Sequence, residues 1–172
     1  MSKLHKAILL LLFCLLAITC TKQLPQTPSN KGNVADKNTA SLLAINQNLA
    51  KKEDSLIKTF ALTQDKTFKK SPIGFWYNID RVGHGSAIKD SVICKLSYRL
   101  LSLKGKILQQ EQQQIVVGKK QIVTGLEEGI KLMNKGDSAT FIIPWYLAYG
   151  MKGNTPAIPA YTSIICKIRV EN

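Results

Sequence analysis

The spacing of apolar residues changes along the chain, and its first regular stretch predicts a helix. Between residues 39 and 65 apolar side chains recur at three-, four- and seven-residue intervals, which places them on one side of an α-helix. The stripe consists of Leu42, Ile45, Leu49, Leu56 and Phe60. Such a stripe needs a cover. We expect the helix either to pack on the domain that follows or to form a homodimer through residues 39–65, and the pattern favours neither.

After a Ser-Pro break at residue 71, the apolar positions alternate, which is typical of strands with one buried face. In the clearest strand the inward positions are Cys94, Leu96, Tyr98 and Leu100. Lys104 and Gly105 have the composition of a hairpin tip. Two further strands are expected around residues 139–143 and 164–170, each with apolar residues at every second position.

A single short helix is predicted between these strands, in the stretch TGLEEGIKLMNKG at residues 124–136. Thr124 and Glu127 fit a capping box at its start, and Gly136 is expected to end it. The apolar stripe of this helix consists of Leu126, Ile130 and Met133. Several antiparallel strands crossed by one short helix predict an α+β domain.

The N-terminus carries the pattern of an export signal. Two lysines precede an apolar run at residues 7–18, which is too short for a comfortable membrane span. The run ends at Cys20 in a sequence that resembles a bacterial lipoprotein cleavage box, although Thr19 stands where Gly, Ala or Ser is usual. We expect residues 1–19 to be a signal peptide and Cys20 to carry a lipid. The alternatives are an uncleaved anchor and cleavage without a lipid.

Composition divides the rest of the chain into three segments. Residues 20–38 are rich in Pro, Asn, Gln, Thr and Lys and predict a flexible tether. Residues 39–70 form the amphipathic helical segment, and residues 71–172 form the α+β domain. A lipid at the start of the tether would anchor this lipoprotein to a membrane of the cell envelope, facing the periplasm.

The formal net charge of +13 raises the question of a nucleic-acid partner. An exported protein does not meet nucleic acid, however, and the lysines are scattered instead of following one helix. We therefore expect a solvated basic surface near an anionic envelope, and no nucleic-acid partner. Two further cysteines, Cys94 and Cys166, are either buried thiols or one disulfide, and their apolar strand patterns favour buried thiols.

Few residues are available for acid–base or metal chemistry. After the signal peptide the chain has one histidine, His84, in a Gly-His-Gly turn. A hydrolytic triad needs a base that titrates near neutrality, most metal sites recruit several histidines, and no phosphate-binding fingerprint is present. We expect no metal and no cofactor. An enzyme of this composition needs a reaction without a nucleophile, and rotation about an Xaa–Pro amide is such a reaction.

The most specific motifs are GLEEGIKLMNKGD at residues 125–137, P-x-x-x-AYG at residues 144–150, and the Ile-Pro pair before the last strand. Together they resemble the FKBP-type peptidyl-prolyl cis/trans isomerases over about residues 73–170. The lipoprotein start, tether and leading helix resemble the gliding-motility-associated FKBP lipoproteins. The resemblance implies an antiparallel sheet wrapped around one short helix. It also implies isomerase (rotamase) activity on proline-containing polypeptides, in support of protein folding.

The same resemblance implies a proline-binding pocket. The residues that match its catalytic positions are Tyr98, Val123 and Tyr149, with the Val123 N–H and the Tyr149 hydroxyl holding substrate carbonyls. Those that match its walls are Ile122, Phe141, Ala148 and Ile158. Phe141 and Ile158 are equally consistent with ordinary core residues.

Several pocket positions depart from the family pattern. Leu126 stands where the family has a tryptophan floor, and other aromatic residues are replaced by Leu108, Gln113 and Cys166. Gln109 stands in place of the acidic residue that orients the pocket. We count Leu108, Gln109, Leu126 and Cys166 among the substrate-binding residues of a wider, less aromatic cup that lacks its carboxylate. Two hypotheses follow: an active isomerase, or a weakly active or inactive binding and assembly module of an envelope machine.

Overall fold

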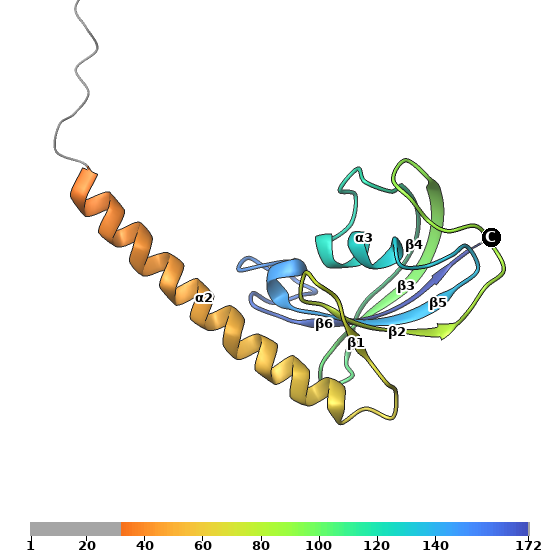
Figure 1. Ribbon diagram of the computed structural model, residues 1–172, viewed down its shortest axis with the longest axis horizontal. Coiled ribbons are helices and arrows are strands. Elements are labelled where there is room, and N and C mark those ends of the chain that lie inside the picture. Colours follow the sequence, from red (N-terminus) through yellow and green to blue (C-terminus); the bar gives the residue numbers. More distant parts are fainter. Residues whose placement is uncertain (1–31, 172) are drawn as a thin grey trace, which may run out of the picture. The chain divides into compact units, whose positions relative to one another are not determined.

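The computed structural model describes residues 32–171, with side chains from residue 39 onward (Figure 1). The predicted signal peptide, Cys20 and most of the predicted tether lie outside the described residues. The chain divides into two compact units at Leu42, and all the strands belong to the second. The elements, in chain order, are α2 (Gly32–Leu62), β1 (Lys69–Lys70), β2 (Trp76–Arg81), β3 (Ile93–Ser102), β4 (Ile107–Val116), α3 (Thr124–Ile130), β5 (Ser138–Ile143), the 3-10 helix η1 (Trp145–Leu147) and β6 (Ile164–Val170).

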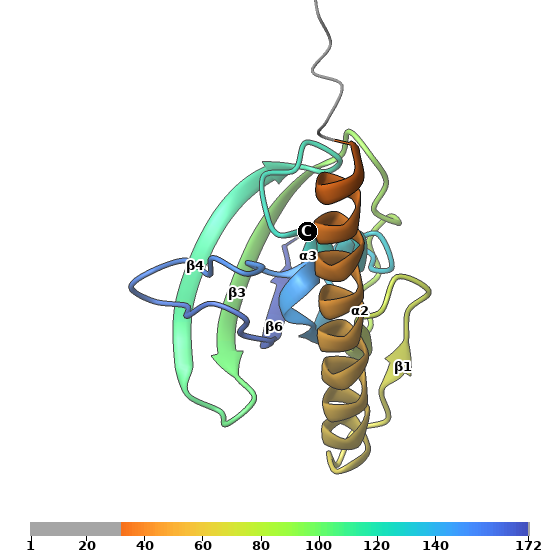
Figure 2. The ribbon, with the colours of Figure 1, turned by 90° about the vertical axis from the view of Figure 1, so that its left-hand side faces the viewer.

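The six strands form one antiparallel sheet in the order β1-β2-β5-β6-β3-β4. The long strands β3 and β4 curve around the side of the sheet on which α3 lies (Figure 1, Figure 2). This arrangement confirms the expected α+β fold, in which an antiparallel sheet wraps around one short helix and a longer helix precedes it. In the described part of the chain, no helix is both long and apolar enough to cross a membrane.

The main core lies between α3 and the concave side of the sheet. The inward positions predicted for β3 and β6 are all buried, and the core residues of α3 contact them. Cys94 and Cys166 are free thiols buried in this core, so the alternative of a disulfide between them is wrong.

Two glycines allow α3 to lie close to β5. Gly125 and Gly129 are buried and lie four residues apart, on one side of the helix. A Cβ atom at Gly125 would lie 2.5 Å from Cγ2 of Ile143, and one at Gly129 would lie 2.7 Å from the ring of Phe141. Contacts this short do not occur between real side chains, so any larger residue would push the helix away from the sheet.

The short helix ends earlier than the sequence predicts. It ends at Ile130, and the expected end at Gly136 is wrong. The backbone beyond it bonds to another segment instead: the Ile88 N–H donates to the Met133 carbonyl at 3.1 Å, and the Lys135 N–H donates to the Ser86 carbonyl at 3.0 Å. Groups that are bonded across to residues 85–88 cannot continue a helical ladder.

The start of α2 also differs from the prediction. The helix begins at Gly32, so residues 32–38 are helical and the predicted tether is too long. Residues 32–62 contain no proline and several alanines, lysines and leucines, which are strong helix formers. Nothing in the sequence therefore stops the helix at residue 39.

The C-terminal part of α2 covers one end of the convex side of the sheet. Ile57 and Ala61 are buried there against Ile142 of β5, and the rings of Phe60 and Trp76 flank this contact. Ile57 is 0% exposed, although it lies outside the predicted apolar stripe. The helix therefore packs on the sheet through a side adjacent to the stripe.

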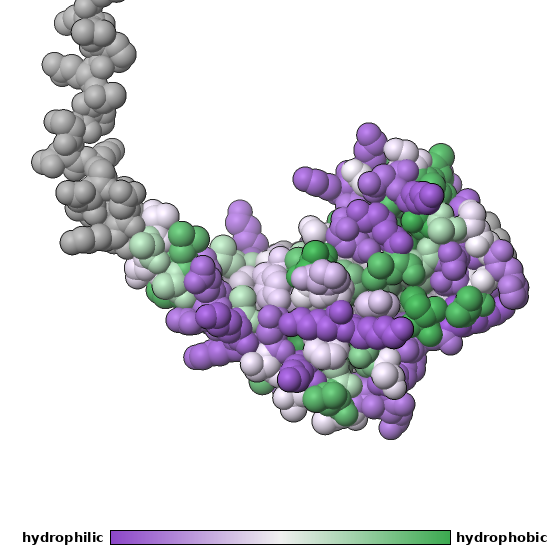
Figure 3. Space-filling model, in the orientation of Figure 1, coloured by the Kyte–Doolittle hydropathy of each residue, from purple (hydrophilic) through white to green (hydrophobic). Residues whose placement is uncertain are grey.

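Most of the predicted stripe remains exposed. Ile45 is 52% exposed, Leu49 is 37% exposed and Leu56 is 62% exposed. Apolar surface is visible among hydrophilic atoms along α2 in the space-filling view (Figure 3). The helix thus has one apolar side that packs on the sheet and a second that the described residues do not cover.

Two apolar residues of α2, the buried Ile57 and the exposed Leu62, test this packing directly. We expect Ile57→Ala to lower the free energy of unfolding by about 2–5 kcal/mol, because it removes a fully buried side chain and leaves a cavity. Leu62 is 72% exposed and lies outside the predicted stripe, so Leu62→Ala should change this free energy by less than about 0.5 kcal/mol. Urea denaturation followed by circular dichroism measures both. Equal effects of the two substitutions would contradict the packing of α2 on the sheet.

Candidate functional site

A cavity of about 300 Å³ opens on the concave side of the sheet, beside the first turn of α3. Its walls come from β3, β4, the turn before α3, the first turn of α3 and the segment after η1. The lining residues are Tyr98, Leu100, Gln109, Glu111, Gln113, Lys120, Gln121, Ile122, Val123, Leu126 and Tyr149.

Tyr98 lies at the centre of a hydrogen-bond network on one wall of the cavity. Its hydroxyl donates to Oε2 of Glu111 at 2.8 Å and accepts from Nε2 of Gln113 at 3.0 Å. Nε2 of Gln109 donates to the other oxygen of Glu111. Residues 109, 111 and 113 share one face of β4 because side chains alternate along a strand, and Glu111 is paired directly with Tyr98.

Burial raises the pKa of the Tyr98 hydroxyl well above its usual range, and the hydrogen bond to Glu111 raises it further. Burial likewise raises the pKa of Tyr149, with a smaller contribution from the charge of Glu111. Both hydroxyls therefore keep their protons at neutral pH. They can donate hydrogen bonds in the cavity and do not act as bases.

Three polar groups at the cavity have no partner among the described residues. The Tyr149 hydroxyl makes no hydrogen bond, and the backbone N–H of Val123 donates to no other group. Oε1 of Gln109 is buried without a hydrogen-bond partner. Two donors and one acceptor are thus available to a bound peptide, beside an apolar floor formed by Leu126, which is 1% exposed.

Glu127 holds the turn that carries Ile122 and Val123. Glu127 is 5% exposed, and its carboxylate accepts from the backbone N–H groups of Gly118 and Lys120, at 3.0 Å each. The predicted capping box is therefore wrong: the N-cap is Val123, which makes no side-chain cap bond. The carboxylate bonds to the preceding turn instead and fixes its position against α3.

The segment that carries Tyr149 is held by aromatic and polar contacts. The rings of Trp145 and Tyr161 meet edge to face with centroids 5.0 Å apart. The backbone N–H of Trp145 donates to Oγ of Ser163 at 2.8 Å, and the Ser163 hydroxyl in turn donates to Glu53 of α2. These contacts explain why an irregular segment between two strands keeps so many large aromatic residues.

A second contact joins α2 to the same segment. The Tyr146 hydroxyl, in η1, donates to Oδ1 of Asp54 at 2.5 Å. Burial raises the pKa of Tyr146, and the bond to Asp54 adds to the shift. The helix is thus bonded to both ends of the Tyr149 segment, through Tyr146 and Ser163.

Six of the predicted site residues line the cavity, and the other five lie in the surrounding core without lining it. Those at the cavity are Tyr98, Gln109, Ile122, Val123, Leu126 and Tyr149. Phe141, Ile158 and Cys166 are each 0% exposed within the core. Leu108 and Ala148 are partly buried and pack against that core. Burial raises the pKa of the Cys166 thiol above its usual range, so this thiol stays protonated.

Glu111 is the main residue that the sequence interpretation missed. A carboxylate was expected to be absent because Gln109 occupies the aligned position, yet Glu111 lies two residues further along the same face of β4. The sequence did contain an indication of this: residues 109, 111 and 113 alternate along a strand, so their side chains share the face on which Tyr98 lies. The expectation that the cup lacks its carboxylate is therefore wrong.

Comparisons with known proteins agree with this geometry. The family described as FKBP-type peptidyl-prolyl cis-trans isomerase matches residues 84–171, which are 88 of the 172 residues. A probable FKBP-type peptidyl-prolyl cis-trans isomerase of Haemophilus influenzae is 29% identical over 108 residues, covering 61% of this chain and 45% of that protein. FkpA of Escherichia coli is 27% identical over 110 residues, covering 62% of this chain and 40% of FkpA.

Solved structures share the fold. The crystal structure of FkpA from Escherichia coli matches with a TM-score of 0.62 at 22% identity, covering 100% of this chain and 73% of that chain. The N-terminal domain of FKBP42 from Arabidopsis thaliana matches with a TM-score of 0.57 at 26% identity, covering 63% of this chain and 92% of that chain. The matches to the curated relatives span less than half of each relative's length. On the match across residues 84–171, the chain belongs to the FKBP-type peptidyl-prolyl cis-trans isomerase family.

Proposed function

We propose that this chain is a peptidyl-prolyl cis/trans isomerase that acts on proline-containing polypeptides of the cell envelope. The observation that supports this most strongly is the cavity beside α3, where the apolar floor of Leu126 lies next to two unpartnered donors. Membership of the FKBP-type family supports the same reaction. No metal or cofactor is part of the proposal.

The reaction requires no bond to be broken. Rotation about an Xaa–Pro amide crosses a barrier of about 18–20 kcal/mol because the planar amide is stabilised by resonance. A twisted amide is less dipolar than a planar one, so an apolar surface such as Leu126 and Ile122 favours it relative to water. We propose that the Val123 N–H holds a substrate carbonyl while the Xaa–Pro bond turns over this floor.

The two tyrosines take different roles in this proposal. The Tyr98 hydroxyl already donates to Glu111 and accepts from Gln113, so its ring is fixed as a wall of the cavity. The Tyr149 hydroxyl has no such partner and is free to donate to a substrate carbonyl. Glu111 is then a positioning residue, because it acts by orienting Tyr98 and Gln109 and not by contact with the reacting amide.

A second candidate function is a weakly active or inactive binding module of an envelope assembly. It is favoured by the polar wall of the cavity, which consists of Gln109, Glu111 and Gln113. Such a wall binds polar parts of a peptide well but offers less apolar surface to a proline ring. A measurement of catalytic turnover distinguishes the two candidates, because only the isomerase accelerates the rotation.

We expect the wild-type protein to accelerate isomerisation of peptides with a large apolar residue before proline. Tyr149→Phe should lower kcat/KM about fivefold, because it removes one hydrogen bond of about 1 kcal/mol. Tyr161→Phe is the matched control, since Tyr161 lies on the same segment, does not line the cavity and should keep its ring contact with Trp145. A protease-coupled assay measures the rates. A wild-type protein that binds these peptides without accelerating them is the binding module instead.

We further propose that the chain is a lipoprotein anchored in the envelope membrane, of the gliding-motility-associated group. The support is the apolar run that ends at Cys20, followed by a tether and a helix before the domain. Cys20→Ala should move the protein from the membrane fraction to the soluble periplasmic fraction, as judged by fractionation and immunoblotting. Continued membrane association of this variant would indicate an uncleaved anchor.

Finally, we propose that the exposed stripe of α2 pairs with a second copy of the chain. Ile45, Leu49 and Leu56 recur at four- and seven-residue intervals and are all exposed in the single chain. Leu49→Glu should convert a dimer to a monomer in light scattering, because it places a carboxylate in an apolar interface. Gln47→Glu, which adds the same charge to the exposed surface of the helix nearby, should leave the dimer intact. A wild-type monomer would contradict the pairing.

A further inference from the structure

The convex side of the sheet has two ends of different character. The end beneath α2 is apolar and covered, with Ile142 packed against Ile57 and Ala61. The other end is polar, and α2 does not cover it. A shallow cavity of about 270 Å³ lies over this uncovered end and takes its lining from β2, β3, β4, β5 and β6.

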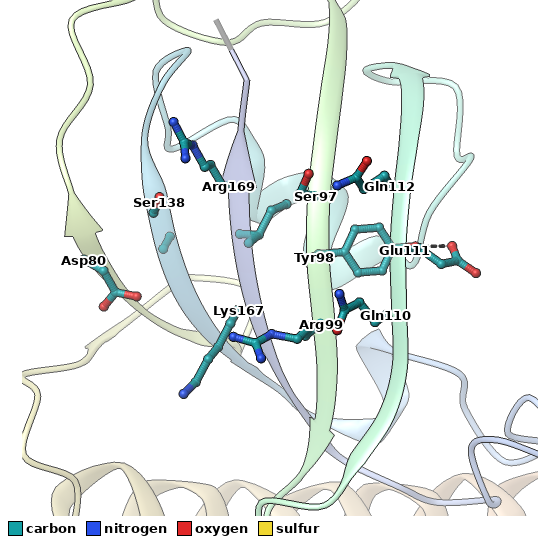
Figure 4. Close-up of a pocket in the computed structure, with 12 residues that line it drawn as sticks. Asp80, Ser97, Tyr98, Arg99, Gln110, Glu111, Gln112, Ser138, Lys167 and Arg169 are labelled. Carbon is teal, nitrogen blue, oxygen red and sulfur yellow. Dashed lines mark hydrogen bonds between the residues drawn. The ribbon is translucent and has the colours of Figure 1, made fainter.

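Strand register brings cations together on the uncovered end. Arg81 of β2 pairs with Ser138 of β5, and Ser138 pairs with Arg169 of β6. In the next row Lys167 of β6 lies directly opposite Arg99 of β3. Residues that pair directly across an antiparallel sheet have their side chains on the same face. Figure 4 looks onto Arg99, Lys167 and Arg169, with Ser97 and Ser138 on either side of Arg169.

No carboxylate among the described residues forms an ion pair with Arg81, Arg99, Lys167 or Arg169. Two acidic residues lie at the margins of this face, and each has a lysine as its ion-pair partner. Asp80 is bonded to Lys66 at 2.6 Å and accepts from Thr140. Glu171 is paired with Lys95 at 2.9 Å and accepts from the Ser97 hydroxyl at 3.3 Å. The bond from Lys95, with a smaller contribution from the charge of Arg169, lowers the pKa of Glu171. Like charges placed directly opposite each other destabilise a sheet. An anionic partner would remove this cost.

We propose that this cationic face, defined by Arg81, Arg99, Lys167 and Arg169, docks on the phosphate groups of an anionic lipid bilayer. Arginine binds phosphate through two parallel N–H donors, and lysine binds it as a point charge. The hydroxyl of Ser138, which lies between Arg81 and Arg169, supplies a further donor. Each cation near an anionic bilayer strengthens its attraction for the protein.

The make-up of the face favours a layer of headgroups over other anions. Single-stranded nucleic acid is bound through aromatic side chains that stack on bases, and this face has none: Tyr98 points to the other side of the sheet, where it bonds to Glu111 (Figure 4). A stable protein partner needs an apolar centre to bury, and the two rows contain only charged and polar residues. The breadth across five strands suits several phosphates in one plane.

Docking through this face leaves the proposed active site accessible. The cavity between Leu126 and Tyr149 lies on the concave side of the sheet, and the cationic face lies on the convex side. A domain held against a bilayer by its convex side therefore presents the cavity to the solution. The inference does not depend on whether the cavity is catalytic.

Flotation of the purified full-length chain with vesicles tests the proposal. One set of vesicles contains phosphatidylcholine alone, and the other contains phosphatidylcholine and phosphatidylglycerol in equal parts. The apolar N-terminal run contributes to the binding of both sets of vesicles. The measured quantity is therefore the ratio of the partition coefficients for the anionic and the neutral vesicles. We expect wild-type protein to prefer the anionic vesicles, and the triple variant Arg99→Thr, Lys167→Thr, Arg169→Thr to lose at least about tenfold of this preference at low salt.

A matched variant separates this face from net charge. Lys89→Gln, Lys106→Gln and Lys119→Gln remove the same formal charge from exposed positions elsewhere and should keep most of the preference. Circular dichroism verifies that both triple variants are folded. Equal losses in the two variants, or no anionic preference in the wild type, would overturn the proposal. Displacement by inorganic phosphate but not by sodium chloride of equal ionic strength would also overturn it, in favour of a discrete phosphate site.

Discussion

Close packing of α3 on the concave side of the sheet is the constraint on which the candidate site depends. Gly125 and Gly129 have no side chains to hold the helix away from Ile143 and Phe141. The helix therefore sits deep enough for Leu126 to close the floor of the cavity. The bonds from Glu127 to the turn before the helix then fix Val123 at the rim. The geometry of the site therefore depends directly on the packing of the core.

The cavity combines a rigid wall with free groups. Tyr98, Gln109, Glu111 and Gln113 bond to one another across β3 and β4, so this wall is held in place before any ligand binds. Hydrogen bonds inside a protein gain strength when they form a connected network. The Val123 N–H and the Tyr149 hydroxyl lie outside that network. This division gives a preformed surface with a small number of donors left for a peptide.

Local sequence patterns predicted the strands well and the ends of the helices poorly. Alternation along β3 and β6 identified the buried residues, because a strand exposes every second side chain. The end of α3 could not be read from Gly136, since residues 85–88 compete for its backbone groups from far away in the sequence. Glu111 was missed for a related reason. Its role depends on pairing with Tyr98 across two strands, whereas alignment considers one position at a time.

The hydrogen bonds between α2 and the Tyr149 segment have an evolutionary consequence. Glu53 and Asp54 accept from Ser163 and Tyr146, which lie at the two ends of that segment. A change on either side leaves a polar group without its partner, so each position restricts which residues the other tolerates. Homologues that keep the leading helix should therefore replace these pairs together. In homologues without the helix this restriction on Tyr146 disappears, whereas Ser163 still accepts from the backbone N–H of Trp145.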